Sequence, residues 1–375
     1  MVENRTVKPK RLLSLDAFRG IAIAGMIMVN NPGNEKTTYS WIAHAAWNGW
    51  TPADLVFPSF IFIMCVAVTL SLSRRGAEGQ DNRKIILHAA RRALILFGLG
   101  LLFGINPGQT PWGFRFAGVF QRLAIVYFLA TLLVLHARPR MWAAAALALL
   151  AAYWAAMKLI PVPGFGAGDL SKAGCLAGYI DNILFKGHMW EPYWDPEGLL
   201  STVPAVASGF IGCLAGDWLR NDKPLAEKIA GLALAGNILI AVAFALNPLF
   251  PINKNLWSPT FALFSSGFAM IALAACMWFI DHKRRKLWAK PFEVLGTNSL
   301  LAYILSGALM YGFSLIPVGE TSAGAATSLK ALLYSNLFAS WAGPWTGSLL
   351  FSAAYVVFWM ALISPLYRKK IFIKL

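Results

Sequence analysis

The segment HAAWNGWTPADLVFPSFIFIMCVAVTLSLSRR, residues 44–75, decides the fold. A polar stretch that holds a histidine, an asparagine and an aspartate runs into an apolar run over 55–73, and two arginines follow. A helix needs about 20 apolar residues to cross the ~30 Å hydrocarbon core of a bilayer. The run therefore predicts a membrane-spanning helix with titratable groups at one mouth and basic residues at the other.

The same pattern recurs along the chain, which has 375 residues, of which 58% are apolar and 13% charged. This composition, with its long apolar runs, is typical of a polytopic membrane protein. We therefore expect an all-α membrane helix bundle that forms a single transmembrane domain over residues 1–375. About ten spans are predicted, at 13–30, 55–73, 86–104, 117–135, 141–160, 199–218, 226–246, 259–280, 293–316 and 346–366.

The segments between the spans include four loops on the side that carries the histidine, at 31–54, 161–198, 247–258 and 317–345. Within the last loop, SLKALLYSNLFASW (328–341) is too short and polar to span. We expect it to lie at the membrane interface or to cap a cavity. The first apolar run is followed by NNPGN without a small-residue cleavage site, so it is interpreted as a true span.

The cysteines argue against a disulfide-stabilised protein and against a metal-binding protein. Three of the four lie inside apolar runs, and only Cys175 falls in a polar loop, so the sequence implies no disulfide framework. Neither a CxxC motif nor a His/Cys cluster with metal-ligand spacing occurs. We expect no metal site.

The basic residues predict the orientation. Of the 33 Lys and Arg residues, 24 fall on the side of the bundle that carries both termini, and six fall on the opposite side. Cytoplasmic segments of membrane proteins carry such an excess of Lys and Arg. We therefore expect both termini in the cytoplasm. The net charge of +16 is explained by topology, and we expect no nucleic-acid partner.

Polar residues inside the first span suggest function. Asp16 and Arg19 are three residues apart, so they share a helix face and can pair. Asn30 lies close to three full turns further, on nearly the same stripe. Ionisable residues within a span are expensive and are candidate functional residues, although Arg19 can also snorkel to the interface. Arg122 in the fourth span allows two interpretations, a structural ion pair with an outer carboxylate or a substrate role.

Helix capping is the structural alternative for several outer residues. Thr51, Asp195 and Ser258 each precede a proline, so each can be an N-cap with the proline at the first helical position. Asp54 then occupies the acidic third position. Capping suffices for Thr51 and Ser258. It does not explain why Asp54 and Asp195 gather on the face that carries His44, so both interpretations stay open for these carboxylates.

His44 is the candidate base. Taken alone, a histidine near a membrane interface is more often an amphipathic anchor, and the two tryptophans of HAAWNGW suit an interfacial belt. An imidazole can nevertheless act as a general base near neutral pH. Composition alone does not decide between these roles.

Five separated motifs resemble the heparan-α-glucosaminide N-acetyltransferase family, which includes a lysosomal transmembrane enzyme and bacterial relatives. They occur in order from the first span to the ninth: SLDAFRGIAIAGMIMVN (14–30), HAAWNGWTPADLVFPSFIF (44–62), DPEGLLSTVPA (195–205), PINKNLWSPTF (251–261) and PFEVLGTNSLLAY (291–303). The final span and residues 317–345 carry little of the resemblance. The small departures, Trp50 in WNGW and Thr297 in GTNS, remove no group that the reaction needs.

The resemblance implies an acetyltransferase that moves an acetyl group from cytosolic acetyl-CoA to the amine of a glucosamine-type sugar on the far side. It implies that His44 matches the catalytic histidine and that Asn30 lies next to the active site. It also suggests a homodimer and a compact bacterial form. We therefore expect an integral protein of the bacterial inner membrane with His44 on the periplasmic side.

Roles for the other polar residues follow from this chemistry. Asn30 or Asn48 can donate a hydrogen bond to the thioester oxygen as negative charge develops. Asp54, Asp195 or Glu197 can orient the imidazole or bind the sugar. Trp47 and Trp257 can stack on the sugar, and Lys254 of the outer INKNLW loop is placed with the acceptor-binding group. On the inner side, Asp16, Arg19 and Asn298 are expected at the CoA site.

Several alternatives stay open. The acetyl group can pass directly to the amine with His44 as base, which we favour, or through an acetyl-histidine intermediate with ping-pong kinetics. The intramembrane charges also suit an amino-sugar or small-metabolite transporter, for which paired broken helices would be typical. An acyltransferase with another acyl donor or an O-acceptor has the same two-sided layout. A membrane assembly protein would make His44 dispensable.

Overall fold

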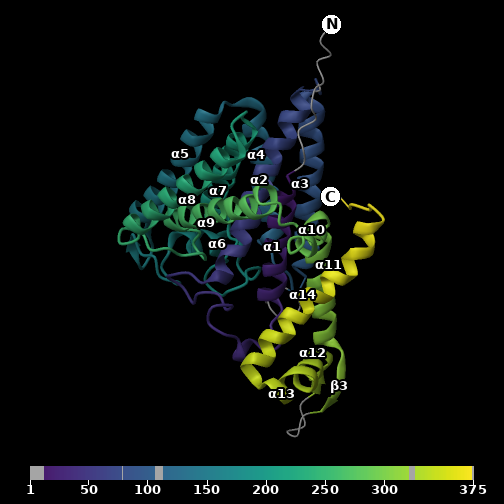
Figure 1. The fold of residues 1–375 in the computed structure, drawn as a ribbon. Helices are drawn as coiled ribbons and strands as arrows, with labels where there is room; N and C mark the ends of the chain where they lie inside the picture. Colours follow the sequence, from purple (N-terminus) through teal and green to yellow (C-terminus); the bar gives the residue numbers. More distant parts are fainter. Residues whose placement is uncertain (1–11, 78, 106–112, 321–325, 374–375) are drawn as a thin grey trace.

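The computed structural model describes residues 12–77, 79–105, 113–320 and 326–373, and it is an almost entirely helical bundle (Figure 1). The described sheet consists of two short antiparallel hairpins. β1 (Pro161–Val162) pairs with β2 (Gly166–Ala167), and β3 (Pro317–Glu320) pairs with β4 (Ala326–Ser328).

Nine helices of the described residues are long and apolar enough to cross a membrane. This confirms the predicted all-α membrane bundle, and each of the nine covers one predicted span. They are α1 (Leu13–Asn30), α2 (Pro52–Ala77), α3 (Asn82–Phe103), α4 (Val119–His136), α5 (Pro139–Leu159), α7 (Leu199–Arg220), α8 (Leu225–Leu246), α9 (Pro259–Cys276) with its π-helical continuation η2 (Met277–His282), and α14 (Pro344–Arg368). The shorter helices outside the broken span are η1 (Glu35–Thr37), α6 (Leu176–Phe185), α12 (Leu329–Tyr334), η3 (Ser335–Ala339) and α13 (Ser340–Ala342).

The predicted span 293–316 is wrong as a single helix. It is divided into α10 (Lys290–Thr297) and α11 (Ser299–Leu315), which meet at an angle of 84°. Asn298 between them has a non-helical backbone, with φ −123° and ψ 41°. Gly20 and Gly296 let the backbones of α1 and α10 touch, because a Cβ atom on Gly296 would lie 2.0 Å from the Asp16 carbonyl oxygen. The close packing holds α10 against α1 while α11 departs.

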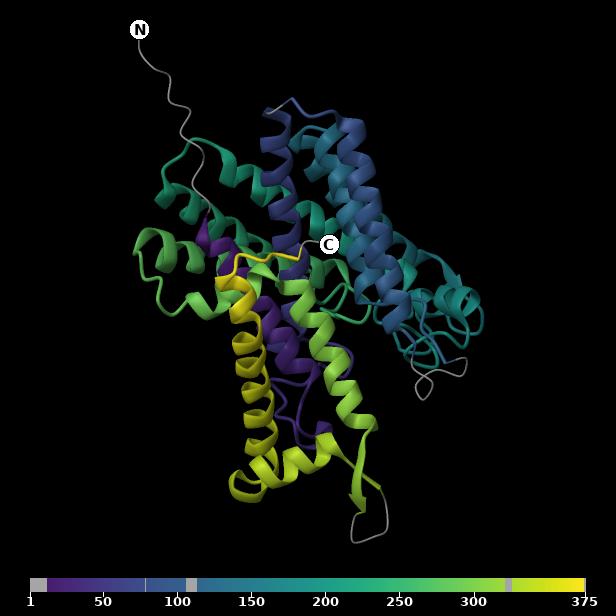
Figure 2. The same cartoon turned by 90° about the vertical axis from the view of Figure 1, so that its right-hand side faces the viewer.

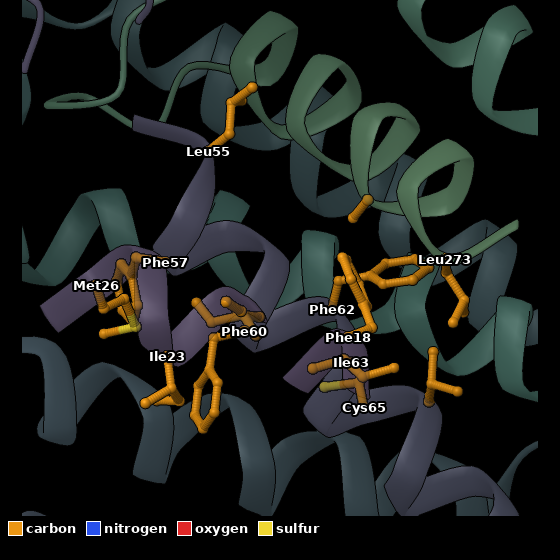
Figure 3. Close-up of a cluster of buried hydrophobic side chains, with 14 of the residues drawn as sticks. Phe18, Ile23, Met26, Leu55, Phe57, Phe60, Phe62, Ile63, Cys65 and Leu273 are labelled. Carbon is orange, nitrogen blue, oxygen red and sulfur yellow. The ribbon is translucent and has the colours of Figure 1, made fainter. Parts of the chain in front are cut away.

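The helices that carry the candidate site lie at the centre of the bundle. Of the most apolar window of each helix, 78% of α7 and 72% of α2 is buried, against 22% of α3 and of α8. Figure 3 shows part of the buried cluster around α2, in which Phe60, Phe62 and Ile63 belong together with Phe18 of α1 and Leu273 of α9. The buried position of α2 gives a rigid support to the groups at its first turn.

The segment 328–341 does not span, in agreement with the sequence analysis. Helices α12 and α13, joined by η3, fold across the start of α14 at the far end of the arm formed with α11 (Figures 1 and 2). Tyr334 donates a hydrogen bond to the Pro344 carbonyl, and the Phe338 ring packs on Phe351 at 5.7 Å between centroids. The segment therefore covers one end of α14.

The four predicted outer loops meet at one end of the bundle. Trp47 donates to the Leu170 carbonyl at 2.9 Å, and the Gly49 amide donates to the Ile252 carbonyl at 2.8 Å. The Tyr39 hydroxyl lies 3.1 Å from that of Thr346, close to the start of α14. The loop 31–54 thus contacts the loops 161–198 and 247–258 and the start of α14, and the candidate site is assembled where it meets the loop 247–258.

Candidate active site

His44 and Asp54 form a pair of an exposed imidazole and a buried carboxylate. The Nδ1 atom of His44 lies 2.8 Å from Oδ1 of Asp54. The Asp54 side chain is 1% exposed, whereas that of His44 is 43% exposed. A carboxylate at Nδ1 favours the tautomer that carries the proton there and leaves a lone pair on Nε2. One side of the imidazole is therefore fixed, and the ring remains accessible.

Asp54 satisfies both interpretations that the sequence left open. Its Oδ2 atom accepts hydrogen bonds from the backbone amides of Thr51 and Ala45, at 3.0 and 3.1 Å. The first of these bonds caps the start of α2, and the second folds the histidine loop back over it. The Thr51 hydroxyl donates to the Ala43 carbonyl at 2.7 Å and closes the same turn. Capping through Oδ2 leaves Oδ1 to hold the imidazole.

Lys254 comes from a loop 210 residues further along the chain and lies against His44. Its Nζ atom is 3.0 Å from Nδ1 and 3.3 Å from Nε2 of His44, and 3.4 Å from Oδ1 of Asp54. An ammonium can point along the lone pair of only one ring nitrogen, so similar distances to both place it over the ring face. Burial lowers the pKa of Lys254, and the negative charges of Asp54 and Glu197 oppose this shift.

Asn253 places this lysine. It is fully buried, its amide nitrogen donates to Oδ1 of Asn48 at 3.1 Å, and its own Oδ1 accepts from the Leu256 amide at 2.9 Å. The Ser258 hydroxyl accepts from the Phe261 amide, which confirms Ser258 as the N-cap of α9. The predicted acceptor-binding residue Asn48 thus faces the loop of Lys254.

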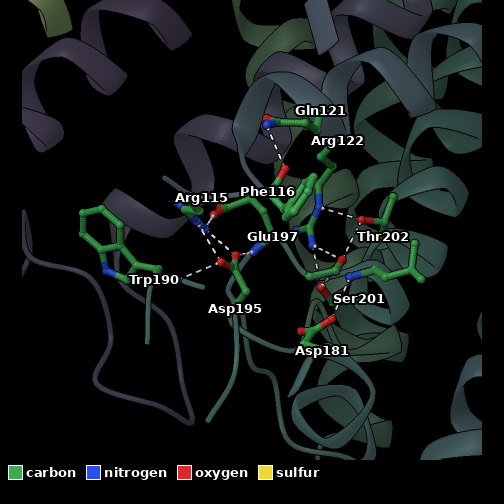
Figure 4. Close-up of polar contacts among 12 residues, drawn as sticks. Arg115, Phe116, Gln121, Arg122, Asp181, Trp190, Asp195, Glu197, Ser201 and Thr202 are labelled. Atoms are coloured by element: carbon green, nitrogen blue, oxygen red, sulfur yellow. Dashed lines mark hydrogen bonds and ion pairs between the residues drawn. The ribbon is translucent and has the colours of Figure 1, made fainter. Parts of the chain in front are cut away.

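A second charged cluster joins Arg115 to Asp195 and Glu197 (Figure 4). The guanidinium contacts both oxygens of Asp195, with Nε to Oδ2 at 2.7 Å, and lies 2.5 Å from Oε2 of Glu197. Burial would raise the pKa of Glu197, but the charges of Arg115, Arg122 and Lys254 hold it below its ordinary range. Because the charge of Lys254 acts on Glu197 as well as on Asp54, this cluster and the His44–Asp54 pair interact electrostatically.

The predicted capping role of Asp195 is wrong. Gly198 is the N-cap of α7, and the amide of Leu199 donates to Oδ1 of Asp181 at 2.9 Å. Asp195 instead accepts from the amides of Trp190 and Glu197 in addition to Arg115. Its carboxylate oxygens are therefore occupied by the protein. Burial raises the pKa of the actual capping carboxyl, Asp181, to about 7.

We expect Arg115→Gln to destabilise the protein by about 3–5 kcal/mol, because it leaves two buried carboxylates without their cation. Thermal unfolding in detergent would measure the loss. Arg220→Gln is the matched control: its exposed pair with Asp217 should contribute at most about 1 kcal/mol. The gap between wild type and Arg115→Gln should shrink as the pH falls through the lowered pKa of Glu197, since a protonated carboxyl no longer needs the cation. Equal losses in both variants would contradict this assignment.

Arg122 forms no ion pair at contact distance with a described carboxylate, unlike the structural alternative that the sequence suggested. It is 1% exposed and donates to the Ser201 and Thr202 hydroxyls and to the Gly198 carbonyl (Figure 4). Its guanidinium lies 4.9 Å from the centre of the Trp257 ring. The carboxylates of the Arg115 cluster act on it from a greater distance, so it lies beneath that cluster as a buried cation.

The predicted sugar-stacking role of Trp257 does not fit the structure. Its side chain is fully buried between Phe57, Phe261 and Arg122, and its Nε1 donates to the Ser208 hydroxyl. No ring face is open to a sugar. Trp47 is only partly buried, with its edge toward Trp194 at 4.9 Å, so its stacking role stays a prediction.

Asn30 and Asn298 mark the two ends of the polar path that the sequence suggested. Asn30 is exposed, and its amide donates to the Tyr303 hydroxyl of α11 at 3.2 Å. Asn298 is buried, and its amide bonds both the Ile371 carbonyl and the Ile373 backbone amide, at 3.1 and 2.8 Å. Figure 2 shows this C-terminal segment crossing the start of α11. The chain itself thus supplies one partner to each amide group of Asn298, and the predicted cofactor contact stays a prediction.

A cavity of about 640 Å³ opens at the end of the bundle opposite the outer loops. Its polar lining includes Asp16, Arg19, Gln80, His88, Arg92 and Thr297. Its apolar lining includes Phe60, Met64, Leu96, Leu123 and Leu300. Arg19 lies 3.5 Å from Asp16, which confirms the predicted contact. Phe60 lies six residues from Asp54 along α2, about 9 Å of helix rise, so the cavity reaches toward the His44 pair.

Four residues of these clusters were not predicted from the sequence. Arg115, Asp181, Tyr303 and Arg92 gain their partners from distant segments, and each looks ordinary in its local context. A single cue existed for Arg115: it is one of only six basic residues on the outer side. Among the described residues, no group of three or more His, Cys, Asp or Glu side chains is arranged to hold a metal ion.

Comparisons of the sequence with known proteins show the family of this chain. Residues 11–174 match the family described as "Heparan-alpha-glucosaminide N-acetyltransferase, catalytic". The protein named heparan-alpha-glucosaminide N-acetyltransferase in Homo sapiens is 33% identical over 354 residues, and that of Mus musculus is 31% identical over 363. These alignments cover 79% and 80% of this chain but 52% and 54% of the relatives, so the chain spans about half of their length. By this similarity, which reaches over most of its own sequence, the chain belongs to the heparan-α-glucosaminide N-acetyltransferase family.

Proposed function

We propose that this protein transfers an acetyl group from acetyl-CoA to the amine of a glucosamine-type sugar. The observation that carries the proposal is the contact between His44 and Asp54 at 2.8 Å. It leaves a lone pair on Nε2 of a side chain that is 43% exposed, and removal of a proton from an amine requires such a lone pair. The names of the two relatives supply the substrate class.

The chemistry assigned to His44 is direct transfer. The sugar amine, once neutral, attacks the thioester carbonyl as Nε2 takes its proton, and a carbon–nitrogen bond replaces the carbon–sulfur bond. The proton held on His44 then goes to the leaving sulfur, so CoA departs as a thiol. Asp54 stabilises the imidazolium between the two transfers. Trapping of acetyl-His44 from labelled acetyl-CoA without acceptor would instead establish the ping-pong route.

The inner cavity is the proposed site of the acyl donor. A CoA thioester combines phosphates with a long, weakly polar arm, and the cavity combines cationic side chains near its polar end with apolar walls that lead toward α2. Arg19 and its partner Asp16 are the proposed donor-binding residues of α1. Exposed Asn30 is proposed to act on the thioester oxygen, and Asn48, Trp47, Glu197 and Lys254 on the acceptor.

The proposed orientation places this cavity in the cytoplasm and His44 in the periplasm, with both termini cytoplasmic, because most basic residues lie on the cavity side. We expect inside-out membrane vesicles to transfer acetyl groups from external acetyl-CoA, while intact right-side-out vesicles do not. Detergent should make the two preparations equal. Activity confined to right-side-out vesicles would reverse the orientation without affecting the chemistry.

The first assay is purified protein in detergent with labelled acetyl-CoA and glucosamine. N-acetylglucosamine identified by mass spectrometry supports the proposal. Binding of acetyl-CoA without this product would point to another acceptor, including an O-acceptor. Failure to bind acetyl-CoA would favour the transporter. The bent α10–α11 pair resembles transporter helices, but the described residues contain no second bent pair to match it.

A further inference from the structure

Arg92 lies inside the membrane part of the inner cavity, where a charge is costly. It is ten residues from the start of α3 at Asn82, about 15 Å of helix rise. It lines the cavity together with His88, Ala89 and Leu96 of the same helix face. An arginine at such depth in a span is a candidate functional residue, because its desolvation must be offset by a partner.

The protein holds this guanidinium but does not neutralise it. Nη1 donates to the Tyr127 hydroxyl at 3.1 Å, and the guanidinium carbon lies 4.9 Å from the centre of the Tyr127 ring. The buried Nε atom has no hydrogen-bond partner in the described part of the chain. No described carboxylate lies within ion-pair distance of Arg92 either. A guanidinium has five N–H donors, so most of them are open to a bound group.

The surroundings of Arg92 indicate which group this is. A planar guanidinium fork suits two oxygens of a phosphate, and such charge-assisted bonds are strong in a dry site. On the inward side of Arg92 the wall is apolar, with Leu96, Leu123 and Phe60. On the side of the opening lie His88 and Gln80. The open donors therefore sit at the border between an apolar channel and a polar vestibule.

We propose that Arg92 binds the diphosphate of the acyl donor. This inference rests on the proposed function. In CoA the diphosphate is the phosphate group that joins the pantetheine arm to the nucleotide, which corresponds to the border at Arg92. The ribose phosphate belongs to the nucleotide end and would lie nearer to the opening. Arg92 would thereby set how far the arm reaches toward His44, with Tyr127 as a positioning residue.

The test compares three donors in detergent: acetyl-CoA, its 3′-dephospho form, and S-acetylpantetheine, which has no phosphate. Arg92→Gln should raise KM about 10–100-fold for both phosphorylated donors, as expected for one lost charge-assisted interaction, and leave S-acetylpantetheine unchanged. Arg91→Gln is the matched control, since Arg91 is the neighbour of Arg92 on α3 but is exposed and does not line the cavity. Arg92→Lys keeps the charge without the fork and should lie between Gln and wild type.

Each outcome separates this inference from the proposed function. Wild type that uses none of the donors would contradict the proposed function itself. Suppose that the wild type prefers acetyl-CoA over S-acetylpantetheine while Arg92→Gln and Arg92→Lys keep the same preference. This result would overturn only the role of Arg92. An effect on acetyl-CoA but not on the dephospho form would assign Arg92 to the ribose phosphate and reject the diphosphate. Equal losses with all three donors would indicate a structural role and also reject it.

Discussion

His44→Ala should lower kcat for acetyl transfer to glucosamine by about 10²–10⁴-fold, the usual contribution of a positioned general base. Binding of acetyl-CoA should not change, because His44 lies among the outer loops and does not line the inner cavity. Turnover of labelled acetyl-CoA measures the first quantity, and thermal stabilisation by acetyl-CoA measures the second. The fold should survive, since the His44 side chain is 43% exposed.

The control for this variant is His136→Ala. His136 is also exposed at the end of a span, but the hydrogen bond that its ring forms within the described part of the chain is to the Leu132 carbonyl of its own helix. Added imidazole should restore part of the activity of His44→Ala, because the exposed site admits a small base. A folded His44→Ala protein with unchanged turnover would remove the base from the mechanism, as a membrane assembly protein would require.

Sequence periodicity and hydropathy predict most of this fold because lipid imposes a strict length and composition on each span. The failure at 293–316 has an identifiable cause in tertiary contacts. The whole segment is apolar enough for one span, but packing of Gly296 against α1 and the side-chain bonds of Asn298 stop the helix. Neither contact is visible in a hydropathy window, since both depend on segments far away in the chain.

The candidate site shows the same division. His44 and Asp54 are ten residues apart, so a short loop and the start of a helix bring them together. Both lie in one motif, and the sequence of that motif was sufficient to suggest that Asp54 orients the imidazole. Lys254 reaches His44 from another loop, and its position over the ring depends on the buried amide of Asn253. Proline spacing predicted helix N-caps at Ser258 and Asp195 alike. Of these two, Ser258 is an N-cap, whereas Asp195 binds Arg115 instead. Local signals fail where a stronger distant partner competes.

Asp54→Asn is the most informative single substitution, because it changes which ring nitrogen of His44 carries the proton. It also removes the negative charge that lies 3.4 Å from Lys254. In the wild type, Oδ2 of Asp54 accepts from the Thr51 and Ala45 amides while Oδ1 faces Nδ1 of His44. In the variant the two backbone amides require an oxygen at the Oδ2 position. The amide nitrogen must therefore face the imidazole.

An amide nitrogen donates, so Nδ1 of His44 has to accept, and the ring proton moves to Nε2. The lone pair that should take the proton of the sugar amine is then lost. We expect kcat to fall by about 10²–10⁴-fold, as for other wrong-tautomer variants of a carboxylate–histidine pair. The control is Thr51→Ala, which removes the hydroxyl that closes the same turn and should cost about 0.5–2 kcal/mol of stability with little change in kcat.

The comparison of these two variants separates capping from positioning. If Asp54 acts mainly as a cap, both substitutions should lower the unfolding temperature and leave kcat of the folded protein intact. If it positions His44, Asp54→Asn should lose turnover even where its thermal unfolding matches that of Thr51→Ala. The second result is the expected one, because the structure assigns a separate carboxylate oxygen to each task.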